Sequence, residues 1–162
     1  MAILTNAGKL ALAQVFRSMD YWCAWGTGNP SWDETGVSGE AYAPTEADTA
    51  LINEIGRRAA SLVEYCTPDP EGTISVPSGT YTPSEERTRH IHLRFIFSLI
   101  DSREQTIREC GVFTNAVIAD GAPNYITPDY VMERGDLVTV ERFDAVVLLN
   151  SPRRVFDFVI TI

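Results

Sequence analysis

Residues 90–97 read HIHLRFIF, a stretch in which apolar side chains occupy every second position. Successive side chains of a β-strand point to opposite faces, so Ile91, Leu93, Phe95 and Phe97 share one face of a strand. That face is apolar throughout, and we expect it to lie in a hydrophobic core.

Further strand candidates lie on both sides of this stretch. They are Tyr21 to Trp25, Arg57 to Cys66, Thr73 to Val76, Thr106 to Phe113, Leu137 to Leu149 and Arg154 to Ile162. Val117 to Asp120 is expected to continue the sheet of the 106–113 strand. Turn residues at 150–152 separate the last two runs, which predicts a terminal hairpin.

Two short helices complete the expected set of elements. Leu4 to Ser18 has helical spacing of its apolar residues, with Thr5 or Asn6 as the N-cap. Its apolar stripe is too short to be stable alone in water, so it must lie on the rest of the domain or on a partner. Asp48 to Ile55 is predicted to form a brief second helix that ends at Gly56.

The fold class is therefore mainly β: an antiparallel β-sandwich with an N-terminal helix and one short additional helix. A parallel α/β sheet would need a helix after nearly every strand. The chain has 162 residues and no linker long enough to separate two domains. We expect one domain over residues 1–162, with the helix at about 4–18 and the sandwich at about 20–162.

The charge balance bears on the class of partner. The net charge is −9 and the pI is near 4.6, which disfavours binding to nucleic acid or to anionic membranes. No apolar run reaches the roughly 18 residues that span a bilayer, and the N-terminus lacks a signal-peptide pattern. We expect a soluble, unexported protein without nucleic-acid or membrane partners.

Three cysteines, Cys23, Cys66 and Cys110, are odd in number and too far apart for a CxxC site. Buried reduced thiols are expected, and one disulfide, within the chain or between subunits, is the alternative.

Candidate catalytic or metal sites are weak. His90 and His92 share a strand face, but no third ligand stands at a suitable spacing, so they are interpreted as ordinary polar-face histidines rather than a metal site. A nucleophile formed by Cys110 and one of these histidines is the remaining alternative. Residues 26–28, Gly-Thr-Gly, lack the context of a dinucleotide loop and predict a turn. We expect no catalytic residues, no cofactor and no metal.

Aromatic residues and long loops suggest contact surfaces. Trp22, Trp25 and Trp32 could stack on sugars, which would make the chain a carbohydrate-binding module, but such residues more often belong to a core or a protein interface. The loops Ser31 to Ala47 and Thr67 to Arg89 exceed the usual length of connections and are expected to contact neighbouring subunits.

Four segments, in this order, resemble the tail-collar fibre family of tailed phages. They are Leu4-Thr5-Asn6-Ala7-Gly8 before an Ala-rich helix, Trp25-Gly26-Thr27-Gly28, Tyr42 and Pro44 followed by Thr49 to Arg58, and Ile107 to Phe113. The combination of Leu-x-x-Glu-x-Gly-Arg and Arg-Glu-x-Gly-Val-Phe carries most of the specificity.

The resemblance implies a structural protein of the virion tail in a collar, a baseplate or a fibre attachment, assembled in the host cytoplasm. It implies binding to other tail proteins and a homo-oligomer, either a ring or a trimer, and it brings no catalytic residues. Fibre proteins of this kind usually continue into a long shaft, whereas this sequence stops at Ile162, so a stand-alone adaptor is expected.

Framework and interface candidates follow from the same segments. Gly56 and Gly111 permit bends or close backbone approach, and Arg57 and Glu109 are predicted to form a charge-assisted bond between two strands. Trp25 and Trp32 complete the candidate set.

Overall fold

The computed structural model describes residues 1–34, 43–98, 101, 105–147 and 153–162. Contacts divide the chain into two compact units. The first comprises residues 1–19, 60–96 and 155–162, and the second comprises residues 20–59 and 97–154. Antiparallel strands dominate both units, which confirms the mainly β fold class. The single-domain organisation stays a prediction.

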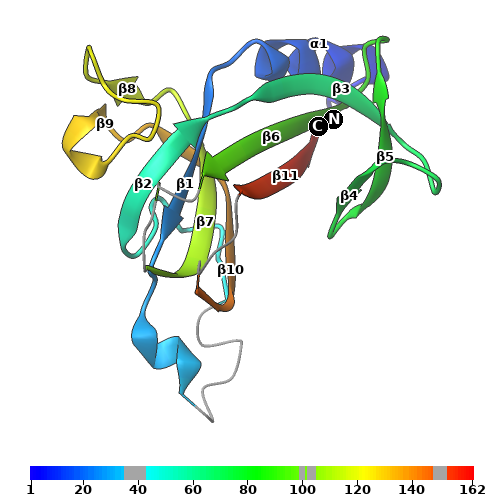
Figure 1. Cartoon of the computed structure of the whole chain (residues 1–162). Coiled ribbons are helices and arrows are strands. Elements are labelled where there is room, and N and C mark those ends of the chain that lie inside the picture. The colour runs from blue at the N-terminus through cyan, green and yellow to red at the C-terminus, as the bar shows by residue number, and fades with distance from the viewer. Residues whose placement is uncertain (35–42, 99–100, 102–104, 148–152) are drawn as a thin grey trace. The chain divides into compact units, whose positions relative to one another are not determined.

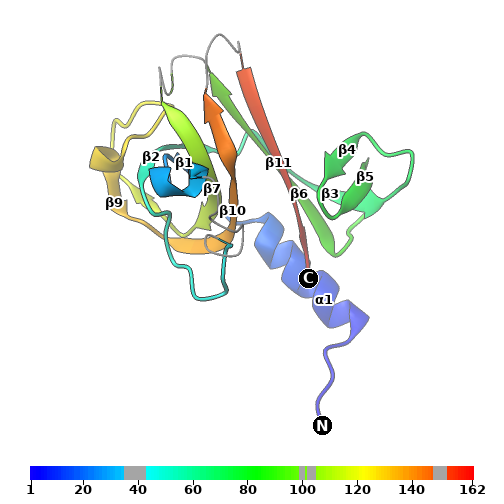
Figure 2. The same cartoon turned by 90° about the horizontal axis from the view of Figure 1, so that it is seen from below.

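The first unit is built on a five-stranded sheet with the order β11-β6-β3-β5-β4 (Figure 1). Figure 2 shows β6 and β11 running side by side and the β4–β5 hairpin beyond β3. The strands are β3 (Leu62–Pro68), β4 (Ile74–Val76), β5 (Gly79–Ser84), β6 (His90–Ser98) and β11 (Arg153–Thr161).

The alternating strand β6 supplies the core of this sheet. Ile91, Leu93 and Phe95 have no solvent exposure, as their common face predicts. The ring of Phe95 meets the ring of Phe158 from β11 edge-on, with centroids 6.0 Å apart. Burial of this apolar face is the main stabilising contribution to the first unit.

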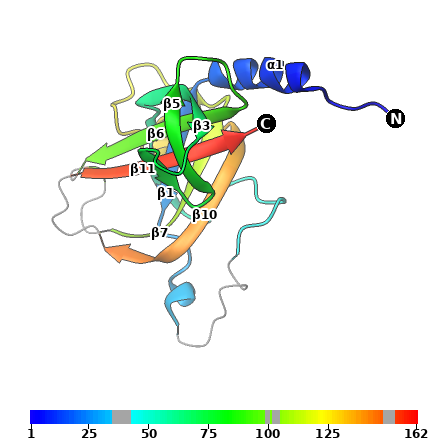
Figure 3. The ribbon, with the colours of Figure 1, turned by 90° about the vertical axis from the view of Figure 1, so that its right-hand side faces the viewer.

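Helix α1 (Asn6–Arg17) confirms the predicted N-terminal helix. Thr5 is the N-cap, and its hydroxyl oxygen accepts the backbone N–H of Gly8 at 3.1 Å. The helix lies beside β3 (Figures 1 and 3), where the guanidinium of Arg17 stands 4.9 Å above the ring of Tyr65. Across the described ranges, no helix has the length and apolar character needed to cross a membrane.

The second unit is built on a four-stranded sheet with the order β10-β7-β1-β2, and a two-stranded sheet of β8 and β9 accompanies it. The strands are β1 (Tyr21–Gly26), β2 (Glu54–Ala59), β7 (Thr106–Thr114), β8 (Val117–Ile118), β9 (Val131–Glu133) and β10 (Asp136–Val147). Two short 3-10 helices, η1 (Pro30–Asp33) and η3 (Pro128–Tyr130), belong to the same unit.

The predicted second helix, Asp48 to Ile55, is wrong. Residues before β2 form turns and bends, and the strand already begins at Glu54. Asp48 accepts the backbone N–H of Thr45 at 2.8 Å and so closes a turn rather than capping a helix. The backbone N–H groups of Ile52 and Asn53 donate to a distant carboxylate, so tertiary hydrogen bonds replace helical ones.

The single strand predicted from Arg57 to Cys66 is two strands, β2 and β3, which belong to different sheets. The chain leaves the strand conformation at Ala60 and Ser61, and Ser61 donates its backbone N–H to the carbonyl of Arg94 at 2.8 Å. The alternation of side chains along a strand does not show where the chain passes from one sheet to another, so the two strands were predicted as one.

The loop predicted from Thr67 to Arg89 holds the expected short strand, now β4, and also β5, which was missed because it contains Pro83. β4 pairs with β5 only as far as Tyr81, so β5 has β3 on one side alone at Pro83. A missing N–H is tolerated where a strand has an open side.

Two further topology predictions are wrong. The 117–120 segment does not extend the large sheet, because β8 pairs with β9. The last two strands do not form a hairpin, since β10 pairs with β7 while β11 pairs with β6. Residues 35–42 of the predicted contact loop Ser31 to Ala47 lie outside the described residues.

Candidate assembly groove

Five of the six candidate residues lie in the four-stranded sheet of the second unit. Trp25 is in β1, Gly56 and Arg57 are in β2, and Glu109 and Gly111 are in β7. All five are buried, and Trp25 lies directly opposite Gly56 in the pairing of β1 with β2. Three of the four segments that carry the family resemblance therefore meet in one sheet, while the Leu4 to Gly8 segment leads into α1 of the first unit.

Arg57 is fully buried and does not form the predicted bond with Glu109. Its Nε and Nη2 donate to the two carboxylate oxygens of Glu54 at 2.7 and 2.8 Å. Nη1 donates to the backbone carbonyl of Arg134 at 3.0 Å, and the guanidinium stands 4.6 Å above the ring of Phe113. The side chain thus ties β2 to the residue that follows β9.

Glu109 is also fully buried, and its carboxylate binds backbone instead of a cation. One oxygen accepts the N–H of Ile52 at 3.1 Å and the other accepts the N–H of Asn53 at 2.9 Å. A carboxylate that accepts backbone N–H groups makes charge-assisted hydrogen bonds, so Glu109 fixes the irregular segment before β2.

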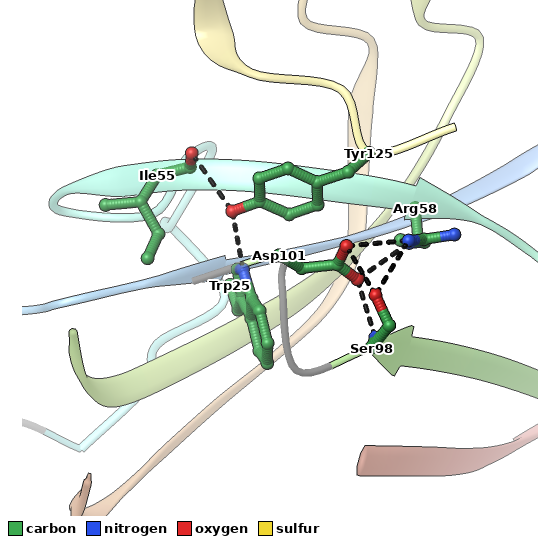
Figure 4. Close-up of polar contacts among 6 residues, drawn as sticks. All are labelled: Trp25, Ile55, Arg58, Ser98, Asp101 and Tyr125. Atoms are coloured by element: carbon green, nitrogen blue, oxygen red, sulfur yellow. Dashed lines mark hydrogen bonds and ion pairs between the residues drawn. The ribbon is translucent and has the colours of Figure 1, made fainter. Parts of the chain in front are cut away.

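Gly56 makes room for an aromatic ring. A Cβ at this position would lie 2.7 Å from Cε2 of Tyr125 and would overlap its Cζ and hydroxyl oxygen. The Tyr125 hydroxyl accepts the indole N–H of Trp25 at 3.0 Å and donates to the carbonyl of Ile55 at 3.3 Å (Figure 4). The indole also stacks on Phe97, with centroids 3.9 Å apart.

A second polar cluster lies beside this aromatic one (Figure 4). Asp101 binds the guanidinium of Arg58 through both carboxylate oxygens, at 2.8 and 2.6 Å. The same carboxylate accepts the backbone N–H and the hydroxyl of Ser98 at 2.7 and 2.9 Å. The Asp101 side chain is only 1% exposed, so four hydrogen bonds compensate for its burial.

Gly111 permits close packing of apolar side chains. A Cβ there would meet Leu137 Cδ1 at 2.9 Å and Leu51 Cδ2 at 3.1 Å. Leu51 in turn belongs to a buried cluster with Ala24 and Phe113. The glycine therefore anchors the segment that Glu109 holds by hydrogen bonds.

These braces support a groove of about 430 Å³ between the segment before β2 and the residues around β9. Its rim carries the exposed side chains of Ile52 (59%) and Met132 (69%) together with the exposed guanidinium of Arg134. Among the residues that the structure describes, none pairs with that guanidinium. Exposed apolar side chains beside methionine and arginine are typical of protein interfaces. The lining residues are Leu51, Ile52, Asn53, Glu54, Arg57, Pro128, Val131, Met132 and Arg134.

Trp32, the sixth candidate, lies in η1 and is partly buried. Its ring fills the space that a side chain at Gly28 would need, and Gly28 adopts a positive φ of 58°. The guanidinium of Arg142 stands 5.6 Å from the ring centroid. One part of the ring is thus covered, and Trp25 is only 1% exposed, so Trp25 offers no platform for a sugar.

Asp33 and Arg108 hold η1 against β7. Both carboxylate oxygens of Asp33 accept from Arg108, with Nε to Oδ1 at 2.9 Å. The guanidinium keeps the pKa of the Asp33 carboxyl below its usual value. Arg108 also donates to the carbonyl of Thr27 at 2.9 Å, which fixes the predicted turn at residues 26–28.

The two histidines differ, and the interpretation of His92 as an ordinary polar-face residue is wrong. His92 is buried in the first unit, where Nδ1 lies 2.9 Å from Glu64 Oε1 and Nε2 lies 2.8 Å from Asp157 Oδ1. Each ring nitrogen of His92 therefore has a carboxylate oxygen within hydrogen-bond distance. His90 Nδ1 contacts the Thr161 hydroxyl at 2.8 Å. Within the described ranges, no group of three or more His, Cys, Asp or Glu side chains is arranged so that it could hold a metal ion.

All three cysteines are buried free thiols. Burial and the neighbouring Cys110 thiol raise the pKa of Cys23 well above its ordinary value, and burial raises that of Cys66 to about 11. Neutral, buried thiols of this kind are inert.

The roles of Tyr125 and Asp101 and the pairing of Glu54 with Arg57 were not predicted from the sequence. Glu54 and Arg57 are three residues apart on one strand, a spacing at which side chains point to opposite faces of a regular strand. Tyr125 and Asp101 lie outside the strands, where no periodicity signals a contact.

Comparison with known proteins agrees with the resemblance that these segments carry. A family model described as "Baseplate wedge 3 tail fiber network component" matches residues 1–162. No curated protein matches the chain. The family match confirms the predicted kinship with phage tail and baseplate proteins. The chain belongs to the family of baseplate wedge 3 tail fibre network components.

Proposed function

We propose that this protein is a non-enzymatic structural component of a phage tail baseplate and that it acts by binding other tail proteins. One observation carries the proposal: the residues of the family-like segments brace a surface groove. Glu109 holds its wall by backbone hydrogen bonds, Arg57 ties β2 to the residue after β9, and Gly111 admits Leu51. The buried charges of Glu109 and Arg57 are used to hold the shape of the groove rather than to act on a substrate.

Two features support a non-enzymatic role. The Cys110 thiol has no solvent exposure, so it offers no nucleophile to a substrate. Both ring nitrogens of His92 are engaged by carboxylates of its own sheet, so its ring is not available as a general base.

The groove is the contact surface we propose for a neighbouring tail protein. Its rim offers Ile52 and Met132 as apolar contacts and Arg134 as a charged one. The floor pair of Arg57 with Glu54 is already satisfied, so a partner that covers it leaves no unpaired buried charge there. The rim arginine requires an acidic group on the partner.

The test uses purified particles of a phage whose own copy of the gene is deleted. The phage is grown in a host that supplies either the wild-type protein or a variant. We expect mass spectrometry to find the wild-type protein in the tail fraction. Arg134→Glu should reduce its incorporation by about tenfold, since a reversed charge at an interface places like charges together. Arg134→Lys is the control, because it keeps the positive charge at the same position and should be incorporated like the wild type.

Absence of the wild-type protein from the tail fraction would contradict the structural role itself. Equal incorporation of Arg134→Glu and Arg134→Lys would instead exclude the groove as the contact surface while leaving that role intact.

We also propose that the protein is a homo-oligomer, a ring or a trimer, assembled in the host cytoplasm and retained in the virion tail. The outward face of α1 supports self-association, because Leu12 and Val15 are exposed while Ala13 is buried, and Leu4, just before the helix, is exposed as well. An apolar face of this kind is costly to leave in water. The β4–β5 hairpin, within the 67–89 segment, is a second proposed contact.

Light scattering on the purified protein tests the oligomer. We expect a mass above that of one chain, and we expect Leu12→Ser with Val15→Ser to lower it. A monomeric wild-type protein at high concentration would exclude self-association of the free protein through this face of α1.

A further inference from the structure

A cavity of about 340 Å³ lies in the first unit and is lined by Asn6, Lys9 and Leu10 of α1 and by Arg89, whereas the groove belongs to the second unit. Its position is fixed by hydrogen bonds. Arg87 donates to the Gln14 side chain at 2.7 Å, which links α1 to the 87–89 segment. The carbonyl of Arg89 accepts the backbone N–H of Ile162 at 3.0 Å.

Both charged residues that line this cavity are cations. Within the described part of the chain, Lys9 and Arg89 have no hydrogen-bond or ion-pair partner for their side chains. Five of the described arginines do pair with a carboxylate. The arginines that pair with a carboxylate are Arg57, Arg58, Arg94, Arg108 and Arg142.

Unpaired cations are notable in a chain that has 22 acidic and 13 basic residues. The charge of Arg89 also acts on its neighbour: burial, and then Arg89, lower the pKa of His90. Asn6 adds an amide donor and Leu10 adds an apolar wall to the two cations. The cavity therefore matches a carboxylate carried beside an apolar side chain.

We propose that the Lys9–Arg89 cavity receives an acidic side chain of a neighbouring protein, which rests on the proposed role in tail assembly. A protein carboxylate suits the cavity better than a nucleic acid or a membrane. A single carboxylate inside the cavity senses mainly the two nearby cations, because the Debye length is about 8 Å at physiological salt. An extended polyanion lies along more of the surface and meets the net charge of −9.

The test titrates the folded full-length protein with the peptide acetyl-Leu-Glu-Glu-Leu-amide and follows NMR shifts of the residues that line the cavity. We expect weak saturable binding, about millimolar, that is lost at high salt. The isosteric peptide acetyl-Leu-Gln-Gln-Leu-amide should not bind. Lys9→Glu and Arg89→Glu should each weaken binding about tenfold.

Arg17→Glu is the matched control, since it also reverses an exposed cation of α1 but does not line the cavity, and it should bind like the wild type. A backbone NMR spectrum of each variant establishes that it is folded. Inorganic phosphate and vesicles of phosphatidylglycerol are titrated in parallel as the other anion sources.

Equal binding of the acidic and amide peptides would overturn the proposal, as would unchanged binding by a folded Arg89→Glu variant. Binding of phosphate or of the vesicles without the acidic peptide would overturn it as well. None of these outcomes affects the structural role, which depends on the presence of the protein in purified tails.

Discussion

Gly56→Ala should destabilise the second unit by removing the space that the Tyr125 ring occupies. The new Cβ would overlap the ring and its hydroxyl. Because Gly56 is held in the pairing of β1 with β2, the ring is the group that must move. Once displaced, the hydroxyl no longer accepts the indole N–H of Trp25, which is bonded at 3.0 Å and buried.

The magnitude follows from two costs. An unsatisfied buried donor costs about 1–3 kcal/mol, and overpacking in a filled core costs about 1–3 kcal/mol. Alanine in a strand recovers roughly 0.5–1 kcal/mol relative to glycine. We therefore expect the free energy of unfolding to fall by about 3 kcal/mol.

Urea denaturation followed by tryptophan fluorescence measures this loss, because Trp22, Trp25 and Trp32 all lie in the second unit. The decisive comparison is the same substitution in a Tyr125→Ala background, where the added Cβ has room. There we expect a cost below about 1 kcal/mol. An equal cost in both backgrounds would refute the argument, since the ring would then not be the obstacle.

Three other perturbations test the charged and thiol groups. Asp101→Asn breaks the buried pair with Arg58 and should lower the free energy of unfolding by about 3 kcal/mol in urea titrations; a loss under about 1 kcal/mol would contradict the bracing role. Burial raises the pKa of Asp157, but the hydrogen bonds and charges of Arg94 and His92 together outweigh burial, and the pKa is lowered. The Asp157 carboxylate therefore stabilises the fold at pH values above its unfolded pKa, and this stabilisation is lost as the pH falls through its folded pKa. Circular dichroism should show a smaller loss of stability below about pH 4 for Asp157→Asn than for the wild type. Burial keeps Cys23 protonated, so maleimide should label it only in denaturant, and rapid labelling of the native protein, read by intact mass, would contradict its burial.

Local patterns were enough to predict several elements. Alternating apolar residues placed β6 and the buried face of Ile91, Leu93 and Phe95 correctly, because strand geometry alone sends those side chains to one side. Thr5 was one of the two N-caps named for α1, since capping uses atoms only three residues apart. The order of short motifs indicated the phage tail family, which the family match confirmed.

The candidate residues were predicted well in kind but less well in their contacts. Gly56 and Gly111 do permit close approach, of Tyr125 and Leu51 respectively. Glu109 is a buried framework residue, but it binds backbone N–H groups in place of Arg57. A buried carboxylate needs hydrogen-bond donors, but the sequence does not show which donors lie within reach of it in the fold.

The sequence by itself determined which side chains are buried in the main strands, where the helix begins and which family the chain resembles, because those properties depend on neighbours along the chain. Only the tertiary structure decided that β10 and β11 join different sheets and that β8 pairs with β9. It also decided that the segment before β2, predicted as a helix, is instead held by hydrogen bonds to Glu109. Strand pairing and buried hydrogen bonds join residues tens of positions apart, and a two-residue period specifies the face of a strand but not its neighbour.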